Sequence, residues 1–142
     1  RRTRATRPLT TEATTETAAR AGLAAAADLP WSPTFSSQER AAMSRLLALA
    51  LLGQGRDAEA REAISPALLI MRGLQQRNRQ DAMVNVEIAK TLYVAALTDP
   101  ARHDALLREA TVLMDAAPAS IRGLLDVQLW RGRMAQEAKL RG

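Results

Sequence analysis

Residues 55–68 read GRDAEAREAISPAL, and this segment gives the clearest indication of the fold. Its apolar residues recur at steps of three and four, the spacing at which side chains share one face of an α-helix, while Arg and Glu occupy the opposite face. Asp57 can cap such a helix, and Pro66 inside it predicts a bend and allows the helix to continue as far as Arg77. The predicted apolar face consists of Ala60, Ala63, Ile64, Ala67 and Leu68.

A second helix is predicted immediately upstream. Ser36 and Glu39 have the spacing of a capping box, in which each side chain bonds a free backbone amide, so this helix should begin at about residue 37. Gly53 and Gly55 should end it, because glycine tolerates the left-handed backbone of a helix terminus. Between these limits the residues at helical spacing are Leu46, Leu47, Ala50 and Leu51.

The turn after residue 77 leads into another predicted helix. Asn78 is expected to adopt the left-handed cap conformation, and Asp81 is expected to cap a helix that runs to Thr98. The apolar residues of this helix recur at steps of three and four, as an α-helix with a buried face requires. They are Ala82, Val86, Ala89, Tyr93 and Ala96.

Two more helices complete the chain. Asp99 followed by Pro100 combines a capping residue with proline in the first turn, which predicts a helix start. Pro118 should end that helix and open the last one, which is predicted to reach about Lys139. The predicted buried side of the last helix consists of Ile121, Leu124, Leu125, Gln128, Leu129 and Trp130.

The first 36 residues have a different character. Residues 1–9 are rich in Arg and Thr and cannot bury enough apolar surface to offset the entropy of ordering, which predicts a disordered basic tail. Residues 10–36 are predicted to form a helix as far as Ala27 and then a Pro-rich loop, with Trp31 and Phe35 of that loop packed on the helices.

Composition supports an all-α chain of about six helices. Hydrophobic residues make up 47% of the 142 residues but aromatics only 3%, and Ala, Leu and Arg dominate over β-branched residues. There are no cysteines, so disulfides and thiolate metal sites are excluded. This fits a reducing compartment and predicts a cytoplasmic location, with a periplasmic one left open. No apolar run approaches the roughly 20 residues of a membrane-spanning helix.

The helical pair at residues 44–68 resembles one repeat of the tetratricopeptide family. Small residues stand where that family brings its two helices together, and larger ones fill the seam. The positions that match are Leu47, Ala48, Leu51, Ala60, Ile64 and Ala67. The resemblance implies that residues 37–142 form antiparallel helical hairpins stacked as a short right-handed solenoid.

A weaker second copy follows in the next helical pair. Its positions lie about 46 residues after the first copy, as from Leu47 to Tyr93, instead of the roughly 34 of the standard repeat. Val94 and Leu106 replace the small residues of the pattern, and Trp130 marks a third first helix without its partner. The second copy comprises Tyr93, Leu97, Leu106, Ala110, Leu113 and Pro118.

The resemblance implies a protein–protein interaction module, a scaffold or adaptor that is part of a larger protein and needs no cofactor or metal. Its partner, a peptide or a helix, would lie along the concave face formed by the first helix of each hairpin. Homo-oligomers are left open. By analogy the groove positions are Arg45, Leu49, Leu52, Thr91, Ala95 and Thr98.

Charge suggests the alternative function, binding of nucleic acid or another anionic ligand. The formal net charge is +5, and the four arginines of the tail supply four of these five charges. The rest of the chain is therefore nearly neutral, which disfavours this alternative. Aromatic residues between the basic ones, which single-strand binding needs, are absent. The candidate clusters are Arg72, Arg77 and Arg79, and Arg131, Arg133, Lys139 and Arg141.

Catalysis has little support in the sequence. His103 is the single histidine and lies in the first turn of a predicted helix beside Asp104, which favours a solvated surface position. The acidic residues have the spacing of helix caps and exposed faces, not of paired catalytic carboxylates. Met71, Met83 and Met114 are interpreted as core residues.

Overall fold

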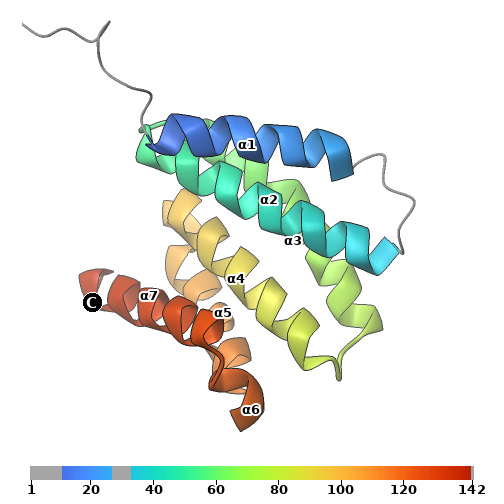
Figure 1. Cartoon of the computed structure of the whole chain (residues 1–142). Coiled ribbons are helices and arrows are strands. Elements are labelled where there is room, and N and C mark those ends of the chain that lie inside the picture. The colour runs from blue at the N-terminus through green and yellow to red at the C-terminus, as the bar shows by residue number, and fades with distance from the viewer. Residues whose placement is uncertain (1–10, 27–32, 142) are drawn as a thin grey trace, which may run out of the picture.

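The computed structural model describes residues 11–26 and 33–141 and is helical throughout (Figure 1). This confirms the all-α prediction, with no strand in the described ranges. The predicted tail at residues 1–9 and the loop residues 27–32, including Trp31, lie outside them. The elements are α1 (Thr11–Ala26), α2 (Pro33–Gly53), α3 (Asp57–Arg77), α4 (Ala82–Thr98), the 3₁₀ turn η2 (Pro100–Arg102), α5 (His103–Asp115), α6 (Ala119–Arg122) and α7 (Leu125–Arg141).

The helices pack largely in chain order. Each of α1 to α4 packs against the next helix along the chain, α2 also packs against α4, and α7 packs mainly against α5. As a result α1 and α7 lie at opposite ends of the array (Figure 1). No described helix is long and apolar enough to cross a membrane.

The turn between α2 and α3 depends on Gly55. Its φ of +76° is the single positive φ among the described residues, and glycine adopts this value without a steric penalty. The Gly55 amide donates to the Leu52 carbonyl at 3.0 Å, and the Arg56 amide donates to the Leu51 carbonyl at 2.9 Å. This is the Schellman pattern, which satisfies the last carbonyls of α2 and reverses the chain.

Two helix starts differ from the predictions. Helix α2 begins at Pro33, so Ser36 lies inside the helix and the capping box with Glu39 does not mark its start. Proline fits the first turn because its missing amide has no partner there in any case. Asp57 is the first residue of α3, and Arg56 occupies the cap without a side-chain bond.

The turn between α3 and α4 is held by side chains. Asn78 ends α3 with a φ of −133°, so the predicted left-handed conformation is wrong; instead its side-chain amide donates to the Leu74 carbonyl at 2.9 Å. The predicted cap at Asp81 is confirmed, because its carboxylate accepts from the amides of Met83 and Val84 at 3.0 and 3.1 Å. Pro66 lies within α3 without ending it.

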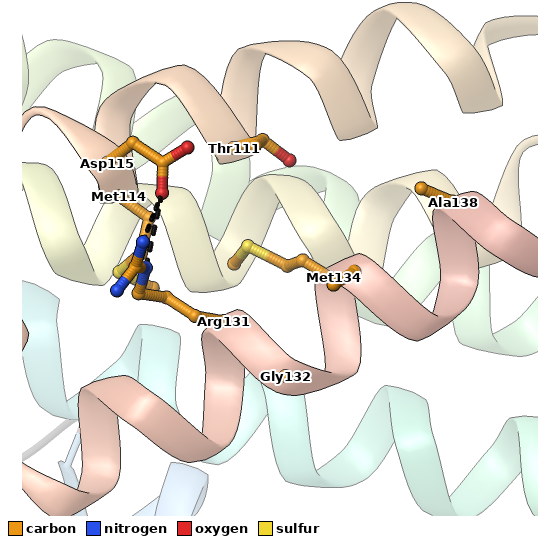
Figure 2. A pocket seen from close by; sticks show the side chains of 8 residues that line it. Thr111, Met114, Asp115, Arg131, Gly132, Met134 and Ala138 are labelled. Atoms are coloured by element: carbon orange, nitrogen blue, oxygen red, sulfur yellow. Dashed lines mark hydrogen bonds and ion pairs between the residues drawn. The ribbon is translucent and has the colours of Figure 1, made fainter.

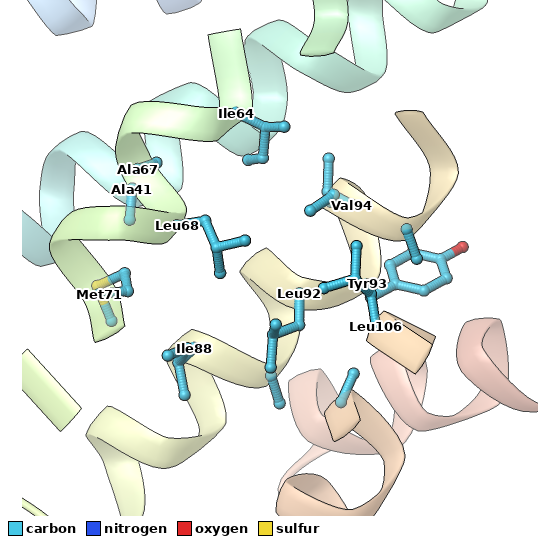
Figure 3. Packing of buried hydrophobic residues seen from close by; sticks show 14 of the residues in the cluster. Ala41, Ile64, Ala67, Leu68, Met71, Ile88, Leu92, Tyr93, Val94 and Leu106 are labelled. Atoms are coloured by element: carbon cyan, nitrogen blue, oxygen red, sulfur yellow. The ribbon is translucent and has the colours of Figure 1, made fainter. Parts of the chain in front are cut away.

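The core is made of small and aliphatic side chains from α1 to α5 and α7 (Figure 3). Ala48 and Ala60 have no exposed surface and Ala67 is 4% exposed, so these three methyl groups are enclosed. Each fully buried Leu or Ile contributes about 2 kcal/mol to folding. The six predicted repeat positions are all buried: Leu47, Ala48, Leu51, Ala60, Ile64 and Ala67.

Enlarging a buried alanine should destabilise the fold. Ala60→Leu inserts three carbons where the neighbouring helices leave no space, and we expect a loss of about 1–3 kcal/mol in the free energy of unfolding, measured by urea denaturation. Ala58→Leu, an exposed position of the same helix, is the control and should change the free energy by less than about 0.5 kcal/mol. If both variants were equally stable, the helices around Ala60 would have space for a larger side chain.

Candidate functional site

Four of the six predicted groove residues are buried: Arg45, Thr91, Ala95 and Thr98 are each at most 5% exposed. Leu49 and Leu52 are half-buried and pack against the core. The four buried side chains therefore make contacts within the chain instead of lining an open groove. The analogy with the tetratricopeptide repeat assigns each residue a position within a repeat. It contains no information on which other side chains cover that residue.

Arg45 begins a chain of alternating charges that joins three helices. Its guanidinium donates to the Glu87 carboxylate at 2.7 Å and to the Thr91 hydroxyl at 3.2 Å, linking α2 to α4. The Lys90 ammonium donates to the other oxygen of Glu87 at 3.0 Å and also to Asp126 of α7. The two acids balance the two bases, so the buried Arg45 and Lys90 cations are not left unpaired.

The indole of Trp130 covers this chain from α7. The Arg45 and Lys90 cations lie 5.7 Å from its ring centroid and the Arg133 cation 5.2 Å, within the range of cation–π attraction. The ring of Tyr93 meets it edge-on at 5.9 Å between centroids. We call Arg45, Glu87, Lys90, Thr91, Asp126 and Trp130 the ion cluster.

Asp126 of the ion cluster and Tyr93 beside it both have shifted pKa values. The hydrogen bond from Lys90 lowers the pKa of Asp126 below its ordinary value, because it stabilises the carboxylate. Burial raises the pKa of the Tyr93 phenol, and the negative charge of Glu137 adds to this effect. These contacts fix how α7 is rotated against α4.

His103 is buried, contrary to the prediction of a solvated position. Only 2% of its side chain is exposed, with Nδ1 2.9 Å from Asp104 Oδ1 and Nε2 2.8 Å from Glu137 Oε2 of α7. The imidazole therefore joins α5 to α7. A carboxylate is within hydrogen-bond distance, but the enclosure leaves no space for a substrate beside the ring. The described residues also contain no group of three His, Cys, Asp or Glu side chains that could hold a metal ion.

A groove with a volume of about 370 Å³ runs between α5 and α7 (Figure 2). Met114 and Met134 come from facing sides, and the α7 side is otherwise made of small residues. Asp115 and Arg131 bridge one end of the groove, with Arg131 Nη2 2.9 Å from Asp115 Oδ1. The lining residues are Thr111, Met114, Asp115, Arg131, Gly132, Met134, Ala135 and Ala138.

Exposed leucines lie one and two helical turns before Gly132 of this groove, and they overturn the predicted buried side of the last helix. Val127 and Met134 are the buried residues of α7, whereas Leu125 is 71% and Leu129 58% exposed. The last helix predicted from the sequence is in fact two helices, α6 and α7, separated at Gly123. The apolar residues before Gly123 therefore do not determine which face of α7 is buried. The predicted residues found exposed are Leu124, Leu125, Gln128 and Leu129.

Another groove, of about 510 Å³, lies between α3 and the α4–α5 connection. Its rim carries Asp57, Arg61 and Glu62, and the Arg61 guanidinium donates to the Thr98 carbonyl at 3.0 Å across it. Three of its seven lining residues are charged, whereas the α5–α7 groove has two charged residues among eight, and those two are bonded to each other. The α5–α7 groove is therefore the better candidate for binding an apolar side chain.

The arginine clusters are partly neutralised within the chain. Arg72 makes two bonds of 2.7 and 3.0 Å to Glu109, and Arg131 is bonded to Asp115. Arg133 lies over Trp130, while Arg77 and Arg79 are exposed on α3 and the following turn. Charges that already have a carboxylate partner add little to phosphate binding.

Met83 is 43% exposed and is not the predicted core residue, whereas Met71 and Met114 are fully buried.

Comparisons with known proteins add no name to this site. No protein-family model, curated protein or solved structure matches the chain.

Breaking the ion cluster should be costly. Arg45→Met keeps an apolar stem but leaves Glu87 with one cation instead of two in a mostly buried position, and we expect a loss of about 3 kcal/mol in the free energy of unfolding. Arg102→Met removes an exposed cation 4.0 Å from Asp99 and should change it by less than about 0.5 kcal/mol. Urea denaturation compares the two, and similar losses would mean that burial of Arg45 is unimportant.

Two further ion pairs hold carboxylates in the charged form. Arg72 and Glu109 join α3 to α5, and the hydrogen bonds from Arg72 lower the pKa of Glu109. Arg56 Nη1 lies 2.9 Å from Glu16 and ties α1 to the α2–α3 turn. The pKa of Glu16 is also lowered, first by the hydrogen bond from Gln54.

Acid should therefore destabilise the chain. A carboxylate whose pKa is lowered by folding stabilises the fold above its unfolded pKa, about 4.3 for Glu, and this contribution disappears as the pH falls through the folded pKa. The urea midpoint should fall between about pH 5 and pH 3. Glu109→Gln and Arg72→Gln should each make that fall shallower, because both remove the same pair. An unchanged slope in both variants would contradict this assignment.

Proposed function

We propose that this chain is a protein-interaction module and that its partner binds the surface formed by α5 and α7. The observation that carries the proposal is an apolar groove between α5 and α7 together with strongly exposed leucines on α7 itself. Leucine side chains in water gain about 2 kcal/mol each when a partner buries them, and a groove lined by small residues and methionines can accept a side chain.

The partner that best fits this surface is an amphipathic helix. The groove follows the direction of α7, and a helix laid beside it can present apolar side chains every three or four residues. The resemblance to the tetratricopeptide repeat supports this reading. If α2 with α3 and α4 with α5 correspond to repeat hairpins, α7 corresponds to a first helix, and the position of a second helix in such a repeat is against α5 and α7.

This proposal moves the site from the predicted groove to the end of the array. Arg45 of the predicted groove is already bonded to Glu87 and lies against Trp130 of α7, so a partner there would have to displace paired charges. Binding of nucleic acid through the arginine clusters is disfavoured, since Arg72 and Arg131 already bond carboxylates. Binding to generic DNA that weakens steeply with salt would support that alternative instead.

A displayed library of amphipathic helical peptides tests the proposed function. Peptides with apolar residues at positions one, four or five, and eight should be enriched on the wild-type chain. Leu129→Asp places a charge beside the groove and should weaken binding at least about tenfold, while Leu69→Asp, at a 74% exposed leucine of α3, should leave it unchanged. Equal binding to both variants would remove the α5–α7 surface as the site.

A further inference from the structure

We infer that the end of α7, residues 135–141, is held against α5 by His103 only while the imidazole carries two protons, so that this helix end forms a proton-controlled latch. The inference goes beyond the proposed function and does not depend on it. The burial pattern of α7, the two carboxylates at the imidazole and the chemistry of the ring support it.

The last turns of α7 have a single inward-facing side chain. From Ala135 to Leu140 every residue is exposed except Glu137, whose side chain is 17% exposed. The nearest buried residue before them is Met134. Apolar burial therefore holds α7 as far as Met134, whereas the turns that follow are attached through Glu137.

Glu137 meets a buried imidazole. His103 is 2% exposed, its Nε2 lies 2.8 Å from Glu137 Oε2, and its Nδ1 lies 2.9 Å from Asp104 Oδ1. Both ring nitrogens therefore face carboxylate oxygens at hydrogen-bond distance. An ionised carboxylate accepts hydrogen bonds and donates none, so the ring satisfies both contacts only as imidazolium, with a proton on each nitrogen.

Loss of one ring proton removes the cation from this site. The Asp104 side chain is 80% exposed and can turn into water, so a neutral ring can keep its remaining proton on Nε2 for Glu137. That hydrogen bond lacks the positive charge that offsets burial of the Glu137 carboxylate. A mostly buried carboxylate without a cation is costly, and water solvates it better. Because Glu137 is the inward-facing residue of these turns, its move into solvent carries the helix end away from α5.

The exposed surface of α7 offers Glu137 another cation. Arg133 precedes Glu137 by four residues, and side chains at this spacing are neighbours on the surface of a helix. A guanidinium keeps its charge at every pH at which proteins fold, unlike an imidazole. The carboxylate therefore has an ionic partner in solvent that remains when the histidine loses its proton.

Other titratable groups lie on the elements packed against α5. From α4, the Tyr93 phenol lies near Glu137, and its pKa is raised by burial and by the charge of Glu137. From η2, Arg102 lies 4.0 Å from Asp99. Among the residue types in this set, histidine is the one that ordinarily changes its charge between about pH 5 and 8. The arginines of α3 that reach toward α5 and η2 are Arg61 and Arg72, paired with Asp99 and Glu109.

The latch is closed on the acidic side of the histidine titration and opens as the pH rises, because raising the pH removes the second ring proton. Opening also changes the α5–α7 groove. Ala135 and Ala138 line that groove from α7, so release of residues 135–141 removes part of its α7 wall (Figure 2).

Nuclear magnetic resonance of the imidazole tests the latch, because the chain has one histidine. In a titration from about pH 5 to pH 8, both ring nitrogens should be protonated at the acidic end. The backbone amide signals of residues 135–141 should change with the same midpoint as the ring, and those of α1 should not. A ring that carries one proton while residues 135–141 stay packed would overturn the inference, as would a ring that titrates without changing those residues.

Two carboxamide variants separate Glu137 from Asp104. Glu137→Gln removes the charge of the mostly buried partner and should lower the proton affinity of the ring at least about tenfold. Asp104→Asn removes an exposed charge and should lower it less than about threefold. At a pH where the wild-type ring carries two protons, amide hydrogen exchange of residues 135–141 should be at least about fivefold faster in Glu137→Gln and close to wild type in Asp104→Asn. Equal effects of both variants would contradict the role given to Glu137.

These experiments contain no partner, so their outcome is separate from that of the proposed function. A ring and a helix end that titrate together in a chain that selects no peptide would keep the latch and overturn the proposed function. Helical peptides that bind with the same affinity on both sides of the histidine titration, with residues 135–141 unchanged, would keep the proposed function and overturn the latch.

Discussion

The structure depends on alanine at the places where helices press together. Ala48, Ala60 and Ala67 are enclosed, and a larger residue at any of them would push neighbouring helices apart. With few aromatics available, the core gains its burial from many small side chains packed closely, not from a few large ones. Because α2, α3 and α4 are thereby fixed, the surfaces at either end of the array are fixed as well.

The ion cluster adds a second constraint, on the rotation of α7. A buried ion pair contributes little net stability, since desolvating the charges offsets most of their attraction. It does select one geometry, however. Asp126 can reach Lys90, and Trp130 can cover both cations, only when that face of α7 turns inward. The leucines elsewhere on α7 must then point into solvent, so the contacts that Asp126 and Trp130 make with α2 and α4 account for the exposed apolar surface of α7.

Local patterns predicted much of this fold but little of its surface. The extent of α3, the cap at Asp81 and the buried alanines follow from helical spacing and capping chemistry, which act over a few residues. Arg45 and Glu87 lie 42 residues apart in the sequence, and His103 and Glu137 lie 34 residues apart. No local sequence pattern therefore indicates that these side chains meet in the folded chain. For α7 the spacing misleads, because apolar residues occur on both of its faces and periodicity alone cannot choose between them.

The two ends of the array differ in a way that concerns association. The outer face of α1 carries threonine, alanine and arginine. At the other end, Leu124, Leu125, Leu129 and Leu140 make up half of the large apolar residues exposed in the described ranges. If the α7 end were only a terminus, a polar face such as that of α1 would serve better and would avoid aggregation. Exposed leucines kept at one end of the array are instead consistent with a surface that is covered when the protein works.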